Sequence, residues 1–419
     1  MGSTEAAGWR PLSVGIIGGG IGGLSTAIAL RRAGHMVTIY ERNDFAGEAG
    51  ASVSCAANGT RWLHEWGVDV EKGDPVVLKK LINRDWTTGE PEEGEGMPVK
   101  LLVNHPCQSI HLPTNQITFS NNTTVRHDLI IGADGIGSVT RKIIGLNPEK
   151  RPAESSCLHA NVLRKDIHKL GLEDYSLNSA LEYWGGQEGK WDKIVLSPCN
   201  GGELLSYYCF FPREKGDYAN QTWGGADLPV EELLAPYPEL DEKVKAHLAI
   251  GIEVRPWRLW VHQPYPYVVK DCVALIGDAA HPMMPHQSQG ACMAIEDAAA
   301  LGILFSKNYF RGDVQESLAV YEKVRLPRAT KVQASAAKAA SNINERIGFS
   351  SNTSMANYKV EDEAKKLTIE EMNAYDMYKD IDQAFAEMDG VAYTDRYVRG
   401  LPFGLRLSNG IQIAGNARL

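Results

Sequence analysis

A glycine-rich turn near the start of the chain constrains the fold more than any other feature. The turn, GGGIGG at 18–23, follows an apolar run at 13–17 and opens an apolar-periodic stretch at 24–30. This order predicts a strand, a tight turn and a helix. Gly18 would permit the turn, Gly20 would let a diphosphate approach the backbone, and Gly23 would allow close packing of helix on strand. The N–H groups at the helix N-terminus would attract the same anion.

A carboxylate extends this nucleotide-binding pattern. Glu41 follows a second predicted strand, 36–40, and lies at about the twenty-residue distance at which a carboxylate accepts hydrogen bonds from a ribose diol. We include Arg42, beside it, and Val53, in the following loop, among the predicted cofactor contacts. Taken alone, the pattern suits a nicotinamide nucleotide equally well, and a glycine turn without a ligand is a further alternative.

Two later turns also follow apolar runs, and each of them places a glycine beside an aspartate at a strand end. Asp134 and Gly135 lie in GADGIGS after an apolar run, and Gly277 and Asp278 lie in LIGDAAHP after another. Because ligands of open parallel sheets bind at the carboxyl ends of the strands, the three turns can converge on one large cofactor. Together they predict a flavin dinucleotide. The alternative for each aspartate is a turn residue that caps a helix.

The composition of the chain excludes some classes of binding partner. The chain has 419 residues, 43% of them hydrophobic, and a net charge of -9 without a basic block, which argues against nucleic acid or an anionic membrane as principal partner. Its seven cysteines never form a C-x-x-C pair, so we expect reduced thiols and no metal site. No apolar run reaches the roughly twenty residues of a membrane span, so we expect no integral membrane segment. We expect a cytoplasmic protein, with a peroxisomal address at Ala417-Arg418-Leu419 as the alternative.

The element pattern predicts an α/β fold: a Rossmann-like FAD-binding domain, a mainly antiparallel β-sheet substrate domain and C-terminal helices. A hairpin is expected around 110–119, a single helix at 289–304, two helices at 314–325 and 329–346, and a helical acidic stretch at 360–388. The expected boundaries are: 10–80, first half of the FAD-binding domain; 81–128, a shortened sheet and hairpin segment; 129–155 and 268–345, the continued FAD-binding domain; 156–267, the substrate-binding sheet; 346–419, a helical extension and tail.

Three motifs carry a family resemblance. They are DGIGSVTR at 134–141, GDAAHP at 277–282 and QGACMAIEDA at 289–298. With them the chain resembles the group A FAD-dependent aromatic hydroxylases, the salicylate hydroxylase and para-hydroxybenzoate hydroxylase family, over roughly residues 12–345. The resemblance implies a monooxygenase that uses FAD, NAD(P)H and O2, through a C4a-hydroperoxyflavin, to hydroxylate or epoxidise an aromatic or polyketide-like small molecule. We list a homodimer as a possible assembly.

The resemblance and the physical chemistry together assign candidate residues. Asp278 would accept a ribityl hydroxyl, and the helix opening at Gly290 and Ala291 would hold the negative charge of a reduced flavin ring. Pro285 would border the flavin where oxygen reacts. Alternation along the middle sheet makes Tyr207 and Tyr208 face opposite ways, and Tyr208 is our preferred substrate contact. The two remaining candidates are acid/base histidines, His159 and His286, for which satisfied core packing is the alternative.

One block of the family pattern is missing. Relatives place a helix opening with a pattern like H-R-x-D-L-H before the D-G strand, whereas this chain runs from NRDWTTGEP at 83–91 directly into EEGEGM at 92–97. Loss of a crossover helix would expose one face of a parallel strand. A second function therefore stays open: a catalytically impaired flavin-fold protein, or a splice or gene-model variant, that does not turn over.

Overall fold

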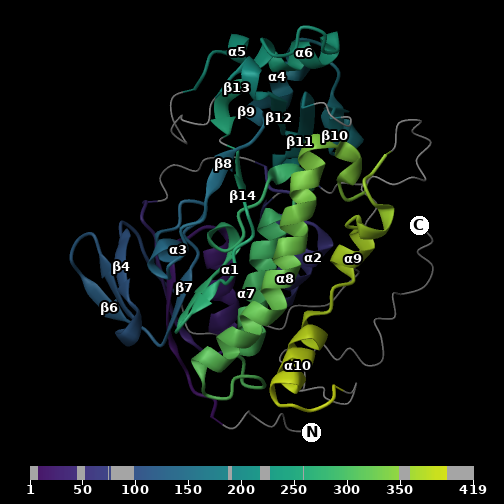
Figure 1. The fold of residues 1–419 in the computed structure, drawn as a ribbon. Coiled ribbons are helices and arrows are strands. Elements are labelled where there is room, and N and C mark those ends of the chain that lie inside the picture. Colours follow the sequence, from purple (N-terminus) through teal and green to yellow (C-terminus); the bar gives the residue numbers. More distant parts are fainter. Residues whose placement is uncertain are drawn as a thin grey trace.

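The computed structural model describes residues 8–44, 52–73, 75–76, 99–186, 191–217, 227–257, 259–348 and 359–393. The missing family block falls at 83–97 and the expected peroxisomal address at 417–419, so both lie outside the described residues. In Figure 1 two units are stacked, one around a mostly parallel sheet and one around an antiparallel sheet.

The first unit is a six-stranded sheet in the order β15-β16-β7-β1-β2-β3. Its neighbours pair in parallel except for β15, which is antiparallel at one edge. The strands are β1 Ser13–Ile17, β2 Met36–Tyr40, β3 Lys100–Leu102, β7 Leu129–Gly132, β15 Val269–Lys270 and β16 Val273–Leu275. On one side of β1 the chain adds β2 and then β3. On the other side it adds β7 and then β16. Such a reversal of strand order is where open α/β sheets bind ligands.

A three-stranded meander follows β3. It contains β4 Cys107–His111, β5 Gln116–Phe119 and β6 Thr124–Arg126. The expected hairpin around 110–119 is confirmed, with Asn115 in the left-handed region at its turn. The meander packs on β2, where the rings of Tyr40 and Phe119 have centroids 4.6 Å apart. On β3 itself, Leu101 is 45% exposed, so this edge strand is only partly covered.

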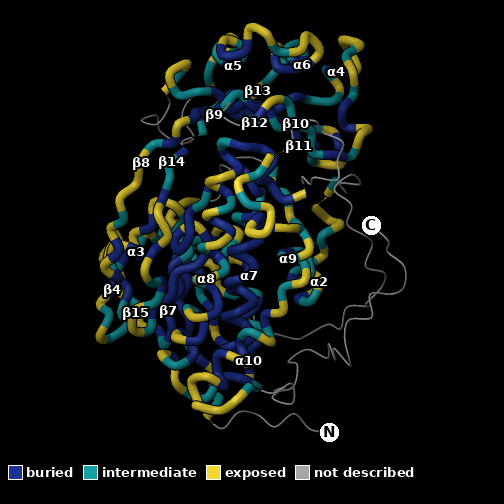
Figure 2. Tube along the Cα trace, turned by 45° about the vertical axis from the view of Figure 1, so that its right-hand side comes forward, coloured by how far each residue is buried: buried dark blue, intermediate teal, exposed yellow. Residues whose placement is uncertain are grey.

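The second unit is a five-stranded antiparallel sheet in the order β10-β11-β12-β9-β13. Its strands are β9 Ser155–Leu163, β10 Glu182–Gly185, β11 Lys193–Cys199, β12 Leu204–Pro212 and β13 Ile252–Trp257. The outer face packs on the helices α4 Arg164–Lys169, α5 Val230–Leu234 and α6 Glu242–Leu248. The inner face points toward the first unit. In Figure 2 exposed residues gather on the turns around α5 and α6, and buried ones along the two sheets.

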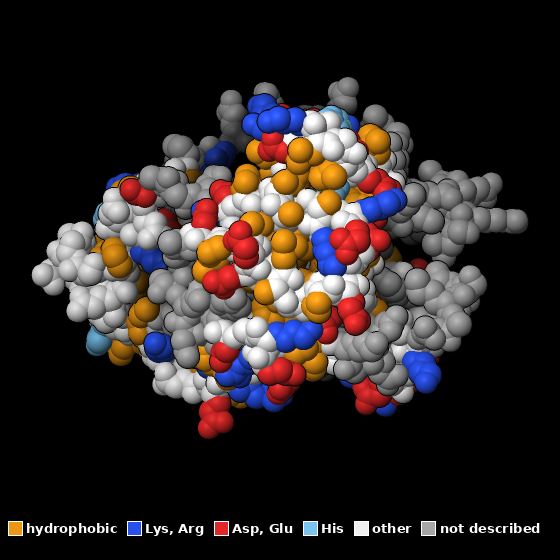
Figure 3. Space-filling view, turned by 90° about the horizontal axis from the view of Figure 1, so that it is seen from above, with side chains coloured by type: hydrophobic (Ala, Val, Ile, Leu, Met, Phe, Trp, Pro, Cys, Tyr) orange, Lys and Arg blue, Asp and Glu red, His pale blue; other side chains and the backbone are white. Residues whose placement is uncertain are grey.

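The outer helices present a mixed surface. Figure 3, which looks down on this end of the molecule, shows acidic, basic and hydrophobic side chains intermingled on this face. Two short strands, β8 Lys150–Pro152 and β14 Trp260–His262, pair where the chain enters and leaves the second unit. This pairing fixes the inner face of the antiparallel sheet above the parallel one.

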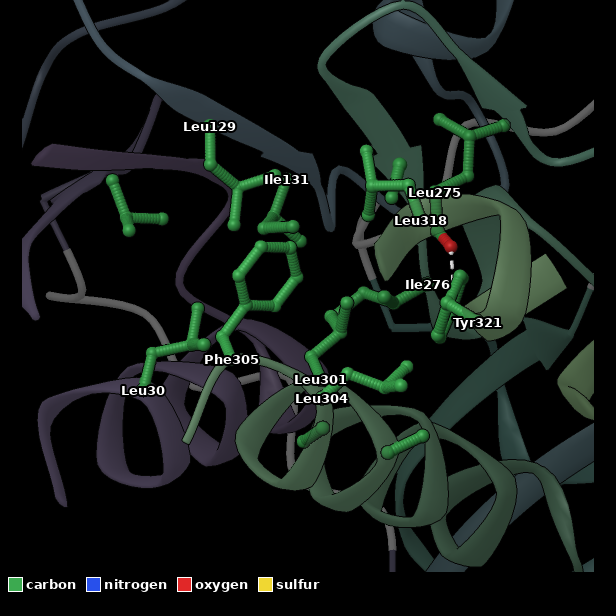
Figure 4. Close-up of a cluster of buried hydrophobic side chains, with 14 of the residues drawn as sticks. Leu30, Leu129, Ile131, Leu275, Ile276, Leu301, Leu304, Phe305, Leu318 and Tyr321 are labelled. Atoms are coloured by element: carbon green, nitrogen blue, oxygen red, sulfur yellow. Dashed lines mark hydrogen bonds between the residues drawn. The ribbon is translucent and has the colours of Figure 1, made fainter. Parts of the chain in front are cut away.

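The main core lies between the parallel sheet and three helices, α1 Ile21–Arg32, α7 Gly290–Leu304 and α8 Val314–Ser341. Figure 4 shows Leu129 and Ile131 of β7 pointing at Leu30 of α1, at Leu301 of α7 and at Phe305, which directly follows α7. Tyr321 of α8 reaches the sheet and donates a hydrogen bond of 2.9 Å to the backbone oxygen of Leu275. β7 and β16 are buried at every position, as expected for strands covered on both faces.

The helical part differs from the sequence expectation in two places. We predicted two helices at 314–325 and 329–346, but α8 is continuous through Pro327 and ends at Ser341. Arg325 and Arg328, on either side of the proline, both bind buried carboxylates, which favours an unbroken helix there. The helix ends earlier because Asn342 leaves helical geometry and its side chain accepts the N–H of Asn344.

The remaining helices are α2 Ala57–Glu65, α3 Val139–Ile143, α9 Ile369–Asn373 and α10 Met377–Met388. The predicted helix at 289–304 is confirmed as α7, whereas the acidic stretch at 360–388 forms two helices with a turn between them. The 3-10 turns that matter for the site are η6 Gly277–Ala279, η7 Pro285–Gln287 and η8 Ile343–Glu345. The α/β fold with a Rossmann-like unit, an antiparallel sheet and C-terminal helices is thus confirmed.

Candidate functional site

The ends of four parallel strands lie level with one another. Tyr40 of β2 pairs with Ile17 of β1, Ile17 with Gly132 of β7, and Gly132 with Leu275 of β16. Gly18 and Glu41 directly follow their strand ends, and Asp134 and Gly277 follow theirs by two residues. The three glycine-containing turns and Glu41 therefore begin side by side along one sheet edge.

Backbone hydrogen bonds hold this row together. The N–H of Ala133 donates to Ile17 O at 2.8 Å, and the N–H of Ile276 donates to Gly132 O at 3.0 Å. The N–H of Gly18 donates to Tyr40 O at 2.9 Å. Because each turn is bonded to the neighbouring strand, their relative positions are fixed by the sheet itself.

The glycines of the first turn differ in what surrounds them. Gly18 has φ +106°, and a Cβ there would lie 2.3 Å from Ala133 O in the second turn. A Cβ on Gly23 would lie 2.0 Å from Gly18 O. Both positions therefore exclude any side chain. A Cβ on Gly20, by contrast, would meet no protein atom within 4 Å, so the backbone there faces open space that a ligand can approach.

Glu41 lies across the mouth of this turn. One carboxylate oxygen accepts the N–H of Gly19 at 2.7 Å, and the other accepts the N–H of Asn43 at 2.9 Å. These bonds orient the carboxylate beside the open side of the glycine turn. Arg42 is exposed next to it, and Val53, which is 56% exposed, precedes α2.

The Asp134 carboxylate caps a helix. It accepts the hydroxyl of Ser138, the backbone N–H groups of Val139 and Thr140 at 2.8 and 3.0 Å, and the hydroxyl of Thr140. This is the arrangement expected from the capping alternative. Gly135, with φ +74° and no protein atom within 4 Å of a Cβ position, leaves the outer side of the same turn open.

Arg141 ties the second turn to the third. The buried guanidinium donates to Asp278 O at 3.3 Å and Ala279 O at 3.2 Å, and to Ile136 O at 2.6 Å. This arginine closes the motif at 134–141 but is not among the candidate site residues predicted from the sequence. Its spacing of seven residues from Asp134 was the available signal, but which backbone it would bind depended on the tertiary structure.

Asp278 is solvent accessible in its turn, yet the surrounding protein raises the pKa of its carboxyl by desolvation, partly offset by His281 and Arg141. A side chain that is both accessible and desolvated lines a recess. Both turns approach Ala294 of α7. A Cβ added to Gly22 would lie 3.4 Å from the Cβ of Ala294, and a Cβ added to Gly277 would lie 3.2 Å from it. The first and third turns therefore both rest on α7.

Two helices point their N-termini at this edge without a cap. In α1 and α7, as described, no side chain accepts a hydrogen bond from the first turn, and neither first turn contains an acidic residue. By comparison, side chains of Ser, Thr or Asp cap α3, α6, α8, α9 and α10. Free N–H groups and the helix dipole make both ends suitable for a negatively charged ligand.

A buried ionic network supports the third turn from below. Asp297 accepts the N–H of Gly277 at 3.0 Å, His281 Nε2 at 2.6 Å and Arg325 Nε at 2.9 Å. Burial alone would raise the pKa of Asp297, but His281 and Arg325 lower it to about 2. The sequence did not predict this network, because acidic residues in the middle of an apolar helix give no indication of their partners.

The second carboxylate of the network, Glu296, is also fully buried. It accepts Arg325 Nη1 at 2.7 Å, Arg328 Nε at 2.6 Å and Asn58 Nδ2 at 2.8 Å. Arg325 and Arg328 outweigh burial and lower its pKa. The network thus joins α2, α7 and α8 behind the sheet edge.

The inner face of the antiparallel sheet carries the predicted substrate residues. Tyr207 faces outward, is fully buried and bonds His247 at 2.9 Å, whereas Tyr208 faces inward. The Tyr208 hydroxyl donates to Ser52 O at 3.0 Å and lies 2.8 Å from Ser52 Oγ. It therefore joins this sheet to the segment before α2.

His159 lies beside Tyr208 on the same face. Its Nε2 is 2.7 Å from Ser206 Oγ, and its ring stacks on Trp257 at 5.8 Å. Burial lowers the pKa of His159 to about 4, so the imidazole is neutral at physiological pH. A neutral imidazole can exchange a hydrogen bond with a substrate but offers no positive charge to an anion.

Pro285 and His286 form the turn that faces this sheet from below. Pro285 opens η7, and the neighbouring Met284 packs with Cys157 and Phe210 of the inner face. His286 is buried, and its Nδ1 lies 3.0 Å from the ammonium nitrogen of Lys193. The structure therefore brings the loop after the third turn into contact with the antiparallel sheet.

Two further findings concern the described residues as a whole. All seven cysteines are free thiols, as expected. Within the ranges that the structure describes, no helix is long and apolar enough to cross a membrane.

Comparison with known proteins places these features in a family. Residues 113–336, more than half of the chain, match the FAD binding domain, and residues 16–83 match the NAD(P)-binding Rossmann-like domain. The chain is 30% identical over 382 residues to 6-methylsalicylate 1-monooxygenase of Aspergillus terreus, covering 77% of this chain and 81% of that protein. It is also 28% identical over 370 residues to hispidin-3-hydroxylase of Neonothopanus nambi, and this match covers 77% of this chain and 87% of that protein.

The fold is also that of solved hydroxylases. The structure of a salicylate hydroxylase substrate complex superposes with a TM-score of 0.63 at 21% identity, covering 89% of this chain and 98% of that one. The tetrameric form of 2-methyl-3-hydroxypyridine-5-carboxylic acid oxygenase superposes with a TM-score of 0.60 at 23% identity. This match covers 79% of this chain and 91% of that one. The FAD binding domain matches more than half of this chain, and a monooxygenase relative is 30% identical to it. The chain therefore belongs to the family of FAD-dependent aromatic monooxygenases.

Proposed function

We propose that this protein is a monooxygenase that uses NAD(P)H and O2 to hydroxylate, or epoxidise, an aromatic or polyketide-like small molecule at a bound FAD. The observation that carries the proposal is the level row of strand ends, which brings the three glycine-containing turns and Glu41 to one sheet edge. Membership of the monooxygenase family supports the same assignment.

The residues at this edge fit an extended dinucleotide. Glu41 would accept the ribose diol, the open backbone at Gly20 would receive the diphosphate, and Asp278 would accept a ribityl hydroxyl. The uncapped N-terminus of α7, at Gly290 and Ala291, would face the ring that becomes negative on reduction. For Asp134 we propose a supporting role, because its carboxylate caps α3, while Gly135 leaves room for a ligand.

When held by these residues, FAD would supply the redox chemistry of a monooxygenase, in which NAD(P)H is the reductant, one oxygen atom of O2 enters the substrate and the other leaves as water. The chain's own task is to hold the ring and keep water out. Tyr208 and His159 would line the substrate side from the antiparallel sheet, and Pro285 and His286 would close it from the opposite loop. We also retain the homodimer as the proposed assembly, which size-exclusion chromatography with light scattering would test.

The experiment that tests the function follows NAD(P)H oxidation by the purified, FAD-loaded protein with a panel of phenols and aromatic acids. We expect at least one compound to accelerate oxidation and to gain one atom of oxygen from labelled O2, detected by mass spectrometry. A protein that stays colourless and ignores added FAD would instead support the impaired flavin-fold alternative.

Removing the Asp278 carboxylate should weaken FAD binding. For Asp278→Ala we expect about a tenfold higher Kd for FAD, because the variant loses one hydrogen bond to a charged group. Folding should not suffer, because the carboxylate is desolvated without an ion-pair partner among the described contacts. Flavin fluorescence titration measures the Kd and thermal unfolding of the apoprotein checks the fold. Unchanged FAD affinity would remove Asp278 from the site.

A further inference from the structure

Two cysteines to which the proposed function gives no role meet where α2 begins. Cys55 precedes Ala56, the N-cap of this helix, and Cys292 lies in the first turn of α7. The backbone N–H of Ala56 donates to Cys292 Sγ at 3.3 Å, across 236 positions of the chain. Because that nitrogen is bonded to the carbonyl carbon of Cys55, the Cys292 sulfur lies within about 6 Å of Cys55 Cα.

The two backbones approach each other closely at this point. A Cβ added to Gly59 of α2 would lie 3.3 Å from Cys292 Cα and 3.1 Å from the Cys292 sulfur. Asn58 donates to Gln289 Oε1 at 3.1 Å and to Glu296 Oε1 at 2.8 Å. These contacts hold the start of α2 against the N-terminal part of α7. A disulfide requires such an approach, since the Cα atoms of its cysteines lie about 4.4–6.8 Å apart.

The two thiols differ in access and in acidity. Cys55 is exposed, whereas Cys292 is buried. The Cys292 thiol, as a hydrogen-bond donor, lowers the pKa of Cys55, and burial opposes this shift. The same hydrogen bond, together with burial, raises the pKa of Cys292. Since the thiolate is the reactive form of cysteine, Cys55 is the more nucleophilic of the two and Cys292 stays protonated beside it.

Four other thiols of the chain do not share these properties. Burial raises the pKa of Cys107, Cys157, Cys199 and Cys209. A raised pKa keeps a thiol protonated and slow to react with an oxidant. An accessible thiol of lowered pKa beside a second cysteine is instead typical of a site that oxidation modifies.

We propose that Cys55 and Cys292 form a site of reversible oxidation, at which hydrogen peroxide converts the two thiols into a disulfide that ties α2 to α7. The Cys55 thiolate attacks one peroxide oxygen, the O–O bond breaks, and the other oxygen leaves as hydroxide and takes up a proton. The Cys292 sulfur then attacks the sulfur of the Cys55 sulfenic acid, and the hydroxyl group leaves as water with the Cys292 proton. The two thiols lose two electrons and two protons, and the peroxide is reduced to two waters.

The pair lies beside the proposed flavin site. Val53, two residues before Cys55, and the N-terminus of α7 at Gly290 and Ala291 are among the predicted cofactor contacts. Reduction of O2 without transfer of oxygen to a substrate yields hydrogen peroxide, so the proposed function would release this oxidant close to the pair. Only this source of peroxide rests on the proposed function, because the thiol chemistry itself needs no FAD.

Mass spectrometry of the protein after treatment with hydrogen peroxide tests the site, with and without FAD. After unfolding in an alkylating reagent, we expect two of the seven thiols to be protected, and dithiothreitol to restore them. Trypsin should release the peptides 43–61 and 271–307 as one cross-linked species. Alkylation of all seven thiols after peroxide, or Cys55 oxidised beyond the sulfenic acid while Cys292 stays a thiol, would overturn the proposal.

Two serine variants make the assignment specific. Peptide 271–307 also contains Cys272, so Cys272→Ser is the matched control and should keep the cross-link. Cys55→Ser changes an exposed position and should abolish the cross-link in a folded protein. A cross-link that persists in Cys55→Ser, or that is lost in Cys272→Ser, would assign the disulfide to other residues and contradict the proposal.

The variant Cys292→Ser tests the order of the two steps. Its hydroxyl can still donate a hydrogen bond to Cys55 but cannot displace the hydroxyl of a sulfenic acid. The Cys55 sulfenic acid should therefore persist, so that dimedone labels Cys55 in this variant and leaves the wild type almost unlabelled. No label on Cys55 in the peroxide-treated variant would show that Cys55 is not the thiol attacking the peroxide. If this variant does not fold, the result with Cys55→Ser decides.

Thermal unfolding of the apoprotein tests whether the disulfide ties the two helices. A cross-link across this length of chain restricts the unfolded state strongly, so the oxidised wild type should unfold about 5 °C above the reduced wild type. Cys55→Ser treated in the same way should show no shift. Equal unfolding temperatures for the oxidised and reduced wild type would mean that the bond does not hold α2 on α7.

Discussion

Replacing Arg325 with methionine is expected to lower the free energy of unfolding by about 3–5 kcal/mol, the cost of leaving a buried charge without its partner. Arg325 is 1% exposed and binds both Glu296 and Asp297. The variant removes the cation that both buried carboxylates share, and leaves Arg328 bound to Glu296 and His281 bound to Asp297. Urea unfolding followed by circular dichroism gives the value.

A surface ion pair on the same helix provides the control. Lys323, half exposed, pairs with Glu387, and Lys323→Met should change the unfolding free energy by less than about 1 kcal/mol. Equal effects of the two substitutions would mean that the network does not carry the stability assigned to it. The Arg325 variant should also bind FAD more weakly, because Asp297 then holds the N–H of Gly277 less firmly.

Substituting Gly20 with alanine is expected to weaken FAD binding by about 100-fold, or about 3 kcal/mol, with little effect on folding. The position has an ordinary φ of −72°, and the added methyl would meet no protein atom within 4 Å. The apoprotein should therefore lose no more than the roughly 1 kcal/mol by which alanine is less favourable than glycine at the N-cap of α1. The methyl would occupy the space through which a diphosphate must approach the backbone.

A second alanine substitution separates this effect from the general cost of replacing glycine. Gly73 also has open space around its Cβ position, and Gly73→Ala should leave FAD affinity unchanged. Gly18→Ala, by contrast, should destabilise the apoprotein itself, because the methyl would lie 2.3 Å from Ala133 O. If Gly20→Ala binds FAD as the wild type does, the diphosphate does not lie at this turn.

Local sequence patterns predicted the scaffold of the site well. The three glycine-containing turns are each preceded by an apolar run, and parallel pairing of those runs is enough to place Gly18, Asp134 and Asp278 at one edge. The alternation of Tyr207 and Tyr208 likewise followed from strand geometry alone. These features depend on a few neighbouring residues, so they can be read without knowledge of the tertiary structure.

Features made by residues far apart in the chain escaped prediction. Lys193 and His286 are 93 positions apart, and their contact needs both sheets in place. Arg325 lies 28 residues from Asp297, and nothing around either residue indicates the other. For Asp134 the motif was found, but the helix-capping contacts of its carboxylate depended on where α3 began. Side-chain roles of this kind are set by packing, which the local pattern does not contain.

An experimental structure of the protein with FAD tests the central claim most directly. We expect electron density for one dinucleotide per chain, running from Glu41 past the open backbone at Gly20 and along Asp278 to the N-terminus of α7. Density elsewhere, or none at saturating FAD, would contradict the proposed FAD site.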